Sequence, residues 1–331
     1  MTETMATRPP GHIENDVLVG QDGMLFLAGG AHRVLAHLTG QLPLPAASLA
    51  AFQANHRARV RLLDQRKISF VHLITPDKHA VVPQLWPFAD QPPRLLADAL
   101  LGQMGEATHH ILHPRDQLRA AGLDAVSRVD SHYTDLGTII VATALAERLT
   151  GRDPAPERAA LLAGLTAWRE QAGDLGGKLS PPVTARERVY ARGLPGRMLT
   201  NDVRGGNTGI IDIHLNRSAA LPQRLALVGD SFGRHVAKFL RPWFREILFI
   251  RSQYFHPEML SLFQPHHVVT QNAERYLANT KPDEGRGHFL LLPMGGREPY
   301  VPSAEFVTTL QAVLSVGRRP YAEFTRQEFG G

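Results

Sequence analysis

The chain has 331 residues, of which 43% are hydrophobic and 20% charged, and its formal net charge is +5. This composition is typical of an ordinary soluble globular protein and excludes a disordered chain. The sequence contains no cysteine. Disulfides, thiolate nucleophiles and cysteine-ligated metal sites are therefore excluded.

The N-terminal residues lack a basic segment followed by an apolar one, and no stretch reaches the roughly 18 uninterrupted apolar residues of a membrane span. We therefore expect this protein to be cytoplasmic. The densest run of arginines, between Arg57 and Arg66, falls on a predicted helix with an apolar stripe and its own acidic residue. This pattern predicts a solvated helix face, and we expect no nucleic-acid partner.

The first half of the chain alternates helical and extended patterns. Apolar residues recur at helical spacing over residues 46–66, and the β-rich run Ile68–Ile74 follows before the breaker Pro76. This order of a helix and then a strand favours an α/β fold. The other elements predicted in this half are a helix over 93–101, a short extended run over Ala125–Val129 and a helix over 135–149.

The second half contains the clearest alternation of strands and helices. Residues 150–208 are less regular and predict one helix around 157–171, so we interpret them as an irregular insertion in a single domain of residues 1–331. The alternation that follows favours a parallel sheet with right-handed crossovers. The predicted strands are Ile210–Leu215, Arg224–Val228, Ile247–Ile250 and His267–Thr270, and the predicted helices are Arg234–Leu240, Pro257–Phe263 and Ala273–Ala278.

In such sheets, ligands bind beyond the carboxyl ends of the strands. The strongest signal there is Gly229-Asp230-Ser231-Phe232-Gly233, which follows a predicted strand and precedes a helix. A serine at this turn exposes its hydroxyl, and the helix N-terminus offers N–H groups to a developing oxyanion. The same pattern suits a serine N-cap, but the strand in front and the helix behind favour a nucleophile. Asp230 is expected to stabilise the turn and the helix start.

A serine nucleophile needs a base, and the base needs an orienting partner. The chain offers two pairs: Asp130 with His132 upstream of Ser231, and Asp283 with His288 downstream, in the order of an α/β-hydrolase. The downstream pair is disfavoured, because its members are close in sequence near a turn rich in proline and glycine.

We expect no metal or nucleotide site. His109 and His113 would form a zinc-binding pair on a helix, but Pro114 and the lack of a suitably spaced carboxylate argue against it. No P-loop occurs, and no G-x-G-x-x-G segment follows a strand.

Four segments resemble, in order, motifs of the AlgX/AlgJ-like alginate O-acetyltransferase family, a circularly permuted branch of the SGNH hydrolases. Val17–Phe26 is similar to the family's V-x-G-x-D-G-W-L-F run, and Ile74–His79 resembles its P-x-K segment. Asp130–Tyr133 resembles the D-x-H-W/Y motif, and Gly229–Phe232 resembles the first SGNH block. The aspartate–histidine block precedes the serine block, which is the permuted order. The resemblance covers roughly residues 15–280.

The resemblance implies a flavodoxin-like SGNH fold with Ser231 as nucleophile, His132 as general base and Asp130 as its orienting partner. The implied reaction is transfer of an acetyl group, through an acetyl-serine, onto a carbohydrate hydroxyl during polysaccharide or glycoconjugate modification. Asn272 suits either an oxyanion donor or a helix N-cap, and Lys78 either a cation for an anionic substrate or a solvated loop residue. The residues expected around the oxyanion and substrate are Asn272, Phe232, Gly233, Tyr133 and Lys78.

The implied partners follow from the same resemblance. No bound cofactor is expected, and the acyl donor is a substrate, either acetyl-CoA or an acetylated carrier. Members of the family usually work in the periplasm and receive acetyl groups through a membrane protein, which becomes an implied partner. With water as the acceptor, the same three residues would make a carbohydrate esterase. A non-catalytic scaffold for polysaccharide assembly is the alternative outside enzymes.

Overall fold

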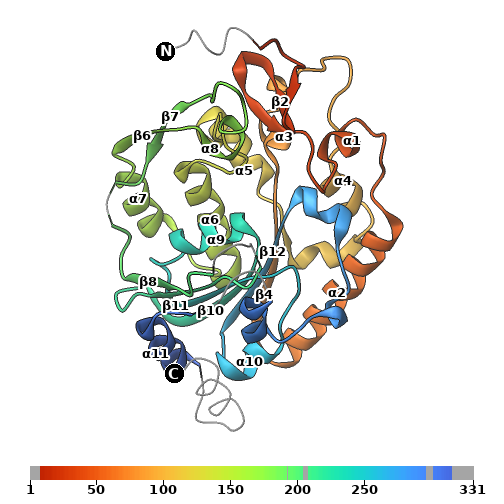
Figure 1. Cartoon of the computed structure of the whole chain (residues 1–331). Coiled ribbons are helices and arrows are strands. Elements are labelled where there is room, and N and C mark those ends of the chain that lie inside the picture. The colour runs from red at the N-terminus through yellow and green to blue at the C-terminus, as the bar shows by residue number, and fades with distance from the viewer. Residues whose placement is uncertain (1–7, 192, 204–207, 296–300, 315–331) are drawn as a thin grey trace.

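The computed structural model describes residues 8–191, 193–203, 208–295 and 301–314. Its centre is a seven-stranded sheet with the order β5-β4-β12-β10-β11-β9-β8 (Figure 1). The strands from β5 to β11 pair in parallel, and β9 and β8 extend the sheet antiparallel. The predicted α/β class is confirmed. The strands are β4 (Ser69–Thr75), β5 (Ile111–Leu112), β8 (Arg197–Thr200), β9 (Ile211–Leu215), β10 (Leu221–Gly229), β11 (Phe244–Arg251) and β12 (His267–Ala273).

Helices cover both faces of this sheet, because successive residues of a strand point to opposite sides. In β10, Leu225 and Leu227 pack with α6 and α9, whereas Ala226 and Val228 pack on the other side with α10 and α11. Figure 1 shows α2 on the same side as α10. The helices are α1 (Val34–Leu38), α2 (Ala46–Gln65), α3 (Lys78–Val81), α4 (Leu96–Leu101), α5 (Arg115–Ala121), α6 (Asp135–Thr150), α9 (Ser231–Phe239), α10 (Glu258–Leu262) and α11 (Ala304–Val313).

Two small antiparallel sheets lie outside the central one (Figure 1). The hairpin of β6 and β7 falls within residues 150–208, of which 192 and 204–207 lie outside the described residues. The predicted helix over 157–171 is wrong in its second half, because α7 ends at Ala163 and residues 167–171 form β6, which pairs with β7. The elements of this part are β1 (Ile13–Glu14), β2 (Val17–Val19), β3 (Leu25–Leu27), α7 (Ala155–Ala163), β6 (Ala167–Gln171), α8 (Gly173–Gly176) and β7 (Ala185–Val189).

Two further predictions need correction. Ala125–Val129 is not a strand of the central sheet. Its main chain forms an isolated bridge from Val126 to Tyr133, and its other hydrogen bonds include those from Leu25 of β3, from α8 and from the Lys78 side chain. The predicted helix over Ala273–Ala278 is a 3₁₀-helix, Glu274–Asn279. No helix in the described ranges is both long and apolar enough to cross a membrane.

Three charged side chains are buried together where β4 and β12 end. Arg275 donates to Asp77 from its backbone N–H and from its guanidinium. Glu274, 1% exposed, accepts hydrogen bonds from the backbone N–H groups of Ala97 and Asp77. Burial, reinforced by the charge of Asp77, raises the pKa of Glu274 to about 8. Folding therefore favours the protonated form of this carboxyl.

This burial predicts a specific pH dependence of stability. Between the ordinary pKa of 4.5 and the raised value of about 8, the folded state holds a proton that the unfolded chain has released, so the free energy of unfolding falls as the pH rises. We expect the Glu274 carboxyl to contribute a loss of about 3.5 kcal/mol between pH 5 and pH 8. Urea unfolding of wild type and Glu274→Gln at both pH values measures this change in the free energy of unfolding. The difference between the two proteins isolates the Glu274 contribution, since other groups titrate equally in both. The same pH dependence in both would contradict this assignment.

Candidate active site

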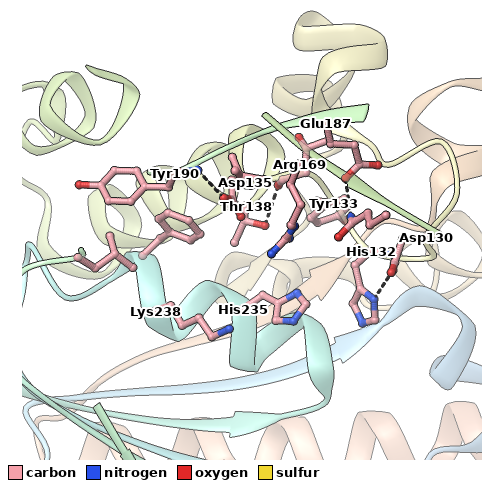
Figure 2. Close-up of a pocket in the computed structure, with 15 residues that line it drawn as sticks. Asp130, His132, Tyr133, Asp135, Thr138, Arg169, Glu187, Tyr190, His235 and Lys238 are labelled. Carbon is pink, nitrogen blue, oxygen red and sulfur yellow. Dashed lines mark hydrogen bonds and ion pairs between the residues drawn. The ribbon is translucent and has the colours of Figure 1, made fainter. Parts of the chain in front are cut away.

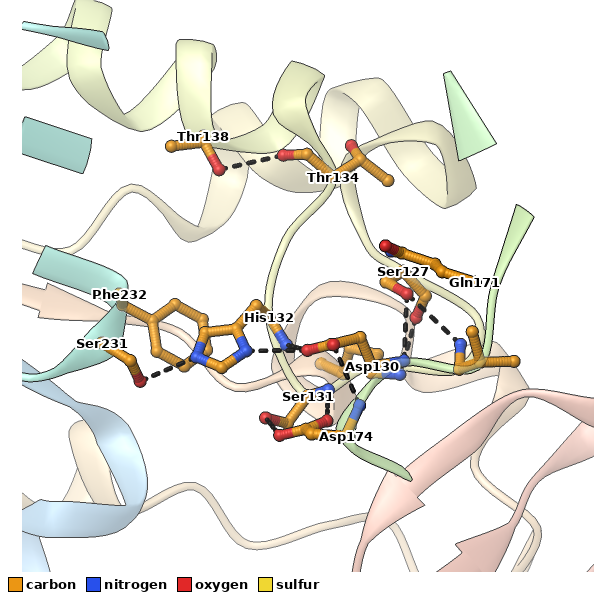
Figure 3. A network of polar contacts seen from close by, with 12 residues as sticks. Ser127, Asp130, Ser131, His132, Thr134, Thr138, Gln171, Asp174, Ser231 and Phe232 are labelled. Carbon is orange, nitrogen blue, oxygen red and sulfur yellow. Dashed lines mark hydrogen bonds and ion pairs between the residues drawn. The ribbon is translucent and has the colours of Figure 1, made fainter. Parts of the chain in front are cut away.

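Three side chains form a hydrogen-bonded row at the carboxyl edge of the sheet (Figure 3). His132 Nε2 lies 2.7 Å from Ser231 Oγ, and His132 Nδ1 lies 2.7 Å from Asp130 Oδ1. Ser231 is the first residue of α9, directly after β10, whereas the other two residues lie in the loop before α6. The fold thus brings together the three residues that the sequence singled out for a triad, across 99 positions of the chain.

Asp130 is held in an ionised state that orients the histidine. Its carboxylate also accepts hydrogen bonds from the backbone N–H groups of His132 and Asp174. Burial alone would raise the pKa of Asp130, but the hydrogen bonds from His132 outweigh it and hold the pKa well below its usual range. An ionised carboxylate only accepts hydrogen bonds, so the neutral His132 ring carries its proton on Nδ1. Its Nε2 is then free to accept the Ser231 proton.

The loop that carries this pair is braced by Asp174. Both oxygens of Asp174 accept from Ser131, one from its backbone N–H at 2.6 Å and one from its hydroxyl at 2.5 Å. Potential ligand atoms of Asp130, His132 and Asp174 lie within 4.8 Å of one another. These atoms already form hydrogen bonds with neighbouring groups. The cluster is therefore better suited to positioning His132 than to binding a metal ion.

Two rings of α9 pack against the His132 imidazole. The Phe232 ring lies 4.7 Å from it and the His235 ring 4.8 Å, measured between centroids. Tyr133, expected beside His132 or in the substrate groove, packs edge-on against Phe232 and donates its hydroxyl proton to Pro76 O at 2.5 Å. It also lines the cavity next to His132.

The serine turn is built around Gln271 of β12. Gln271 Oε1 accepts from the N–H groups of Asp230 and Gly233 at 2.9 and 3.1 Å, and its Nε2 donates to Thr75 Oγ1. A Cβ at Gly229 or Gly233 would lie only 2.4 or 2.7 Å from this oxygen. The two glycines are therefore required by the close approach of a side chain. Gln271 directly follows the predicted strand His267–Thr270, but the sequence analysis assigned it no role.

The donors for an oxyanion differ from the expectation. The N–H groups of Phe232 and Gly233 are occupied, by Asp230 Oδ1 and by Gln271. Ser231 N–H, in contrast, has no acceptor within the described part of the chain. Asn272 lies inside β12 rather than at a helix start, and its side chain makes no hydrogen bond to described residues. It lines a cavity of about 220 Å³ with Gly229 and Asp230.

Asp230 caps α9, as expected. One oxygen accepts from Phe232 N–H at 2.8 Å and the other from Ala273 N–H at 2.6 Å. The carboxylate therefore ties the helix start to the end of β12, and both of its oxygens are used in doing so.

Lys78 lies in the interior, and its burial contradicts both expected roles, a cation for an anionic substrate and a solvated loop lysine. The side chain is 4% exposed, and Nζ donates at 2.6 Å to Leu25 O and to Ser127 O. Burial lowers the pKa of Lys78 to about 7, although the carboxylates of Asp130 and Asp174 act in the opposite direction. The ammonium group therefore links β3 to the loop that carries Asp130.

The residues of the alternative catalytic pair and of the histidine pair considered for zinc lie elsewhere, with other partners. Asp283 forms two hydrogen bonds with the guanidinium of Arg59, and His288 Nδ1 accepts from Leu290 N–H. His109 lies in the last turn of the 3₁₀-helix Gly105–His110 and His113 follows β5, so the two are not on one helix face.

Several solved structures share this fold. A structure of Bacillus cereus PatB1 has a TM-score of 0.54 at 12% identity, over 80% of this chain and 99% of that one. A DHHW family protein from Eubacterium siraeum has a TM-score of 0.55 at 13% identity, over 84% and 96%. The O-acetyltransferase domain of Pseudomonas putida AlgJ has a TM-score of 0.47 at 20% identity, over 85% and 99%.

No model of a known protein family matches the sequence, and no curated protein sequence matches it either. The likeness to PatB1 and to the DHHW family protein establishes the fold class. The likeness to these two structures agrees with the α/β fold that the four sequence motifs imply.

Replacing Gln271 by leucine tests the role of its amide. The substitution leaves two buried N–H groups without an acceptor, so we expect a loss of about 3 kcal/mol in the free energy of unfolding and slower acylation of Ser231. Urea unfolding measures the first effect, with the exposed Gln103→Leu as the matched control. Equal stability of Gln271→Leu and the control would contradict the role.

Replacing Lys78 by methionine tests its link to the Asp130 loop. The carbonyls of Leu25 and Ser127 lose their donor inside the protein, and we expect a loss of about 2 kcal/mol in the free energy of unfolding. We also expect slower acylation, because the loop is released. Lys178→Met, at an exposed position, controls for the loss of a lysine. A Lys78→Met protein that matches wild type in both measurements would refute the link.

Proposed function

We propose that this protein is a serine-dependent O-acyltransferase that carries an acetyl group on Ser231 from a donor to a carbohydrate hydroxyl. The observation that carries the proposal is the row of Ser231, His132 and Asp130, with both hydrogen bonds at 2.7 Å. The four family motifs in permuted order support the acetyl group and the carbohydrate acceptor.

In the first half-reaction, Ser231 Oγ attacks the acetyl carbonyl carbon while His132 Nε2 takes its proton. Asp130 stabilises the imidazolium that forms. Negative charge collects on the carbonyl oxygen, for which Ser231 N–H is the available backbone donor. The bond to the donor's leaving group then breaks, and His132 returns the proton to that group. Ser231 is left acetylated.

In the second half-reaction, the acceptor hydroxyl loses its proton to His132 as its oxygen attacks the acetyl-serine. The ester bond to Ser231 breaks, and His132 returns the proton to Oγ. A cavity of about 390 Å³ lined by His132 supports an alcohol, rather than water, as the acceptor. Polar side chains dominate its wall, as expected for a sugar.

The first test uses intact-mass spectrometry after incubation with p-nitrophenyl acetate. We expect an acetyl adduct and nitrophenol release in wild type and in His288→Ala. Ser231→Ala should form no adduct, because the nucleophile is absent. In His132→Ala, adduct formation should be about a thousandfold slower, because the base is lost.

An adduct on Ser231→Ala at the wild-type rate would overturn the assignment of the nucleophile. Loss of the adduct in His288→Ala together with its retention in His132→Ala would overturn the assignment of the base. Oligosaccharides added to the acetylated protein then separate the two possible reactions. Acetylated sugar indicates a transferase, whereas free acetate alone indicates an esterase.

A further inference from the structure

Ser127 is buried at the start of the loop that carries Asp130 and His132, with 1% of its surface exposed. Its N–H donates to the carbonyl oxygen of His132 at 3.3 Å, so the two ends of the loop are joined. Its hydroxyl oxygen accepts hydrogen bonds from the N–H groups of Val129 at 3.3 Å and of Asp130 at 3.0 Å (Figure 3). This one residue therefore holds the backbone at Asp130 and at His132.

The proton of the Ser127 hydroxyl is donated to the carboxylate of Glu187 on β7. Glu187 is 9% exposed and also accepts a hydrogen bond from Gln171 Nε2 at 2.8 Å. Because an ionised carboxylate only accepts hydrogen bonds, the Ser127 proton points at Glu187, and the lone pairs of Oγ remain for the two loop N–H groups. A hydrogen bond from a hydroxyl to a carboxylate is stronger than one between neutral groups.

Lys78 holds Ser127 at a second point, because its ammonium group donates to the Ser127 carbonyl at 2.6 Å. Burial lowers the pKa of Lys78 to about 7, whereas nearby carboxylates, Glu187 among them, act in the opposite direction. With its N–H, carbonyl and hydroxyl all bonded within the protein, Ser127 has no polar group left for a substrate. Its contacts are suited to holding the loop in place.

These bonds attach the loop to a hairpin that lies outside the central sheet. Glu187 lines the cavity of about 390 Å³ together with Asp130 and His132 (Figure 2). Directly after β7, Tyr190 N–H donates at 2.7 Å to Asp135, the first residue of α6. The hairpin therefore holds the loop at its beginning and again just past its end.

We propose that Ser127 and Glu187 are positioning residues for the catalytic base, which hold the loop so that His132 Nε2 stays within hydrogen-bond reach of Ser231 Oγ. The proposal rests on the proposed function, because it takes His132 as the base. Without the carboxylate of Glu187, the Ser127 hydroxyl is free to turn away from the loop N–H groups. A displacement of about 1 Å between reacting groups slows a reaction by up to about a hundredfold.

Pre-steady-state kinetics with p-nitrophenyl acetate measures how fast Ser231 is acetylated. We expect Ser127→Ala and Glu187→Leu to lower the maximal rate of acetylation about tenfold and to leave KM nearly unchanged, because the base is displaced while substrate binding is not. Glu187→Gln keeps an oxygen that accepts the Ser127 proton, so its rate should stay within about twofold of wild type. A Glu187→Gln protein as slow as Glu187→Leu would refute the role of this acceptor.

Proton NMR reports the placement of His132 independently of any reaction. The Nδ1 proton of His132, hydrogen-bonded to the Asp130 carboxylate, gives a resonance far downfield, which is assigned by its absence in His132→Ala. We expect this resonance to move upfield or broaden in Ser127→Ala. A role limited to stability would leave it unchanged in the folded protein.

Thr184→Val is the matched control. Thr184 Oγ1 donates to the Glu170 carboxylate at 2.7 Å, and both residues are exposed on the same hairpin. The substitution thus removes the same kind of hydrogen bond away from the loop, and we expect the wild-type rate and resonance. Urea unfolding shows whether each variant is folded under the assay conditions, and variants on two separate segments keep the test decisive if one does not fold.

Wild-type acetylation in both Ser127→Ala and Glu187→Leu, or equal slowing in Thr184→Val, would overturn the positioning role. Failure of the proposed function gives a different result. If wild type forms no acetyl-serine but the His132 resonance changes in Ser127→Ala, the positioning role stands and the transferase falls. If wild type is acetylated and neither rate nor resonance changes in the variants, the reverse holds.

Discussion

The hydrogen bond between His132 Nε2 and Ser231 Oγ joins two loops from opposite halves of the chain, and the surrounding structure holds both loops in place. On the serine side, Asp230 and Gln271 satisfy the N–H groups at the start of α9 and bind this turn to β12. On the histidine side, the loop is braced by Lys78, which is buried, and by Asp174, which is exposed. Because a proton passes efficiently only over hydrogen-bond distances, a small shift of either loop would separate the base from the nucleophile.

The interior contains many charged groups, and their partners reveal which of them serve the fold. Asp77 with Arg275, Asp212 with Arg234 and Asp130 with His132 are paired through direct hydrogen bonds. Glu274 is held without an opposite charge, and its pKa is raised accordingly. Lys238 is partly buried, and the charges of Asp212 and Asp135 act against the lowering of its pKa by burial.

Local sequence patterns predicted the secondary structure correctly where it depends on neighbouring residues in the chain. The apolar run Leu225–Val228 predicted a buried strand, and the periodicity of residues 135–149 predicted α6. The patterns failed where distant contacts decide the conformation. Residues 167–171 are a strand because they pair with β7. The Ala125–Val129 segment remains outside the central sheet because β3, α8, nearby loops and the Lys78 side chain take its hydrogen bonds.

The sequence by itself determined the serine turn, its glycines and the capping carboxylate Asp230, because a strand, a tight turn and a helix start are set by adjacent residues. With the family resemblance, it also selected Asp130 and His132. Only the tertiary structure decided that Gln271 occupies the N–H of Gly233, that Lys78 is buried rather than exposed to substrate, and that Arg169 reaches over α9. These outcomes depend on how β12, α3 and the β6–β7 hairpin pack against the triad, and packing between segments far apart in the chain leaves no local pattern in the sequence.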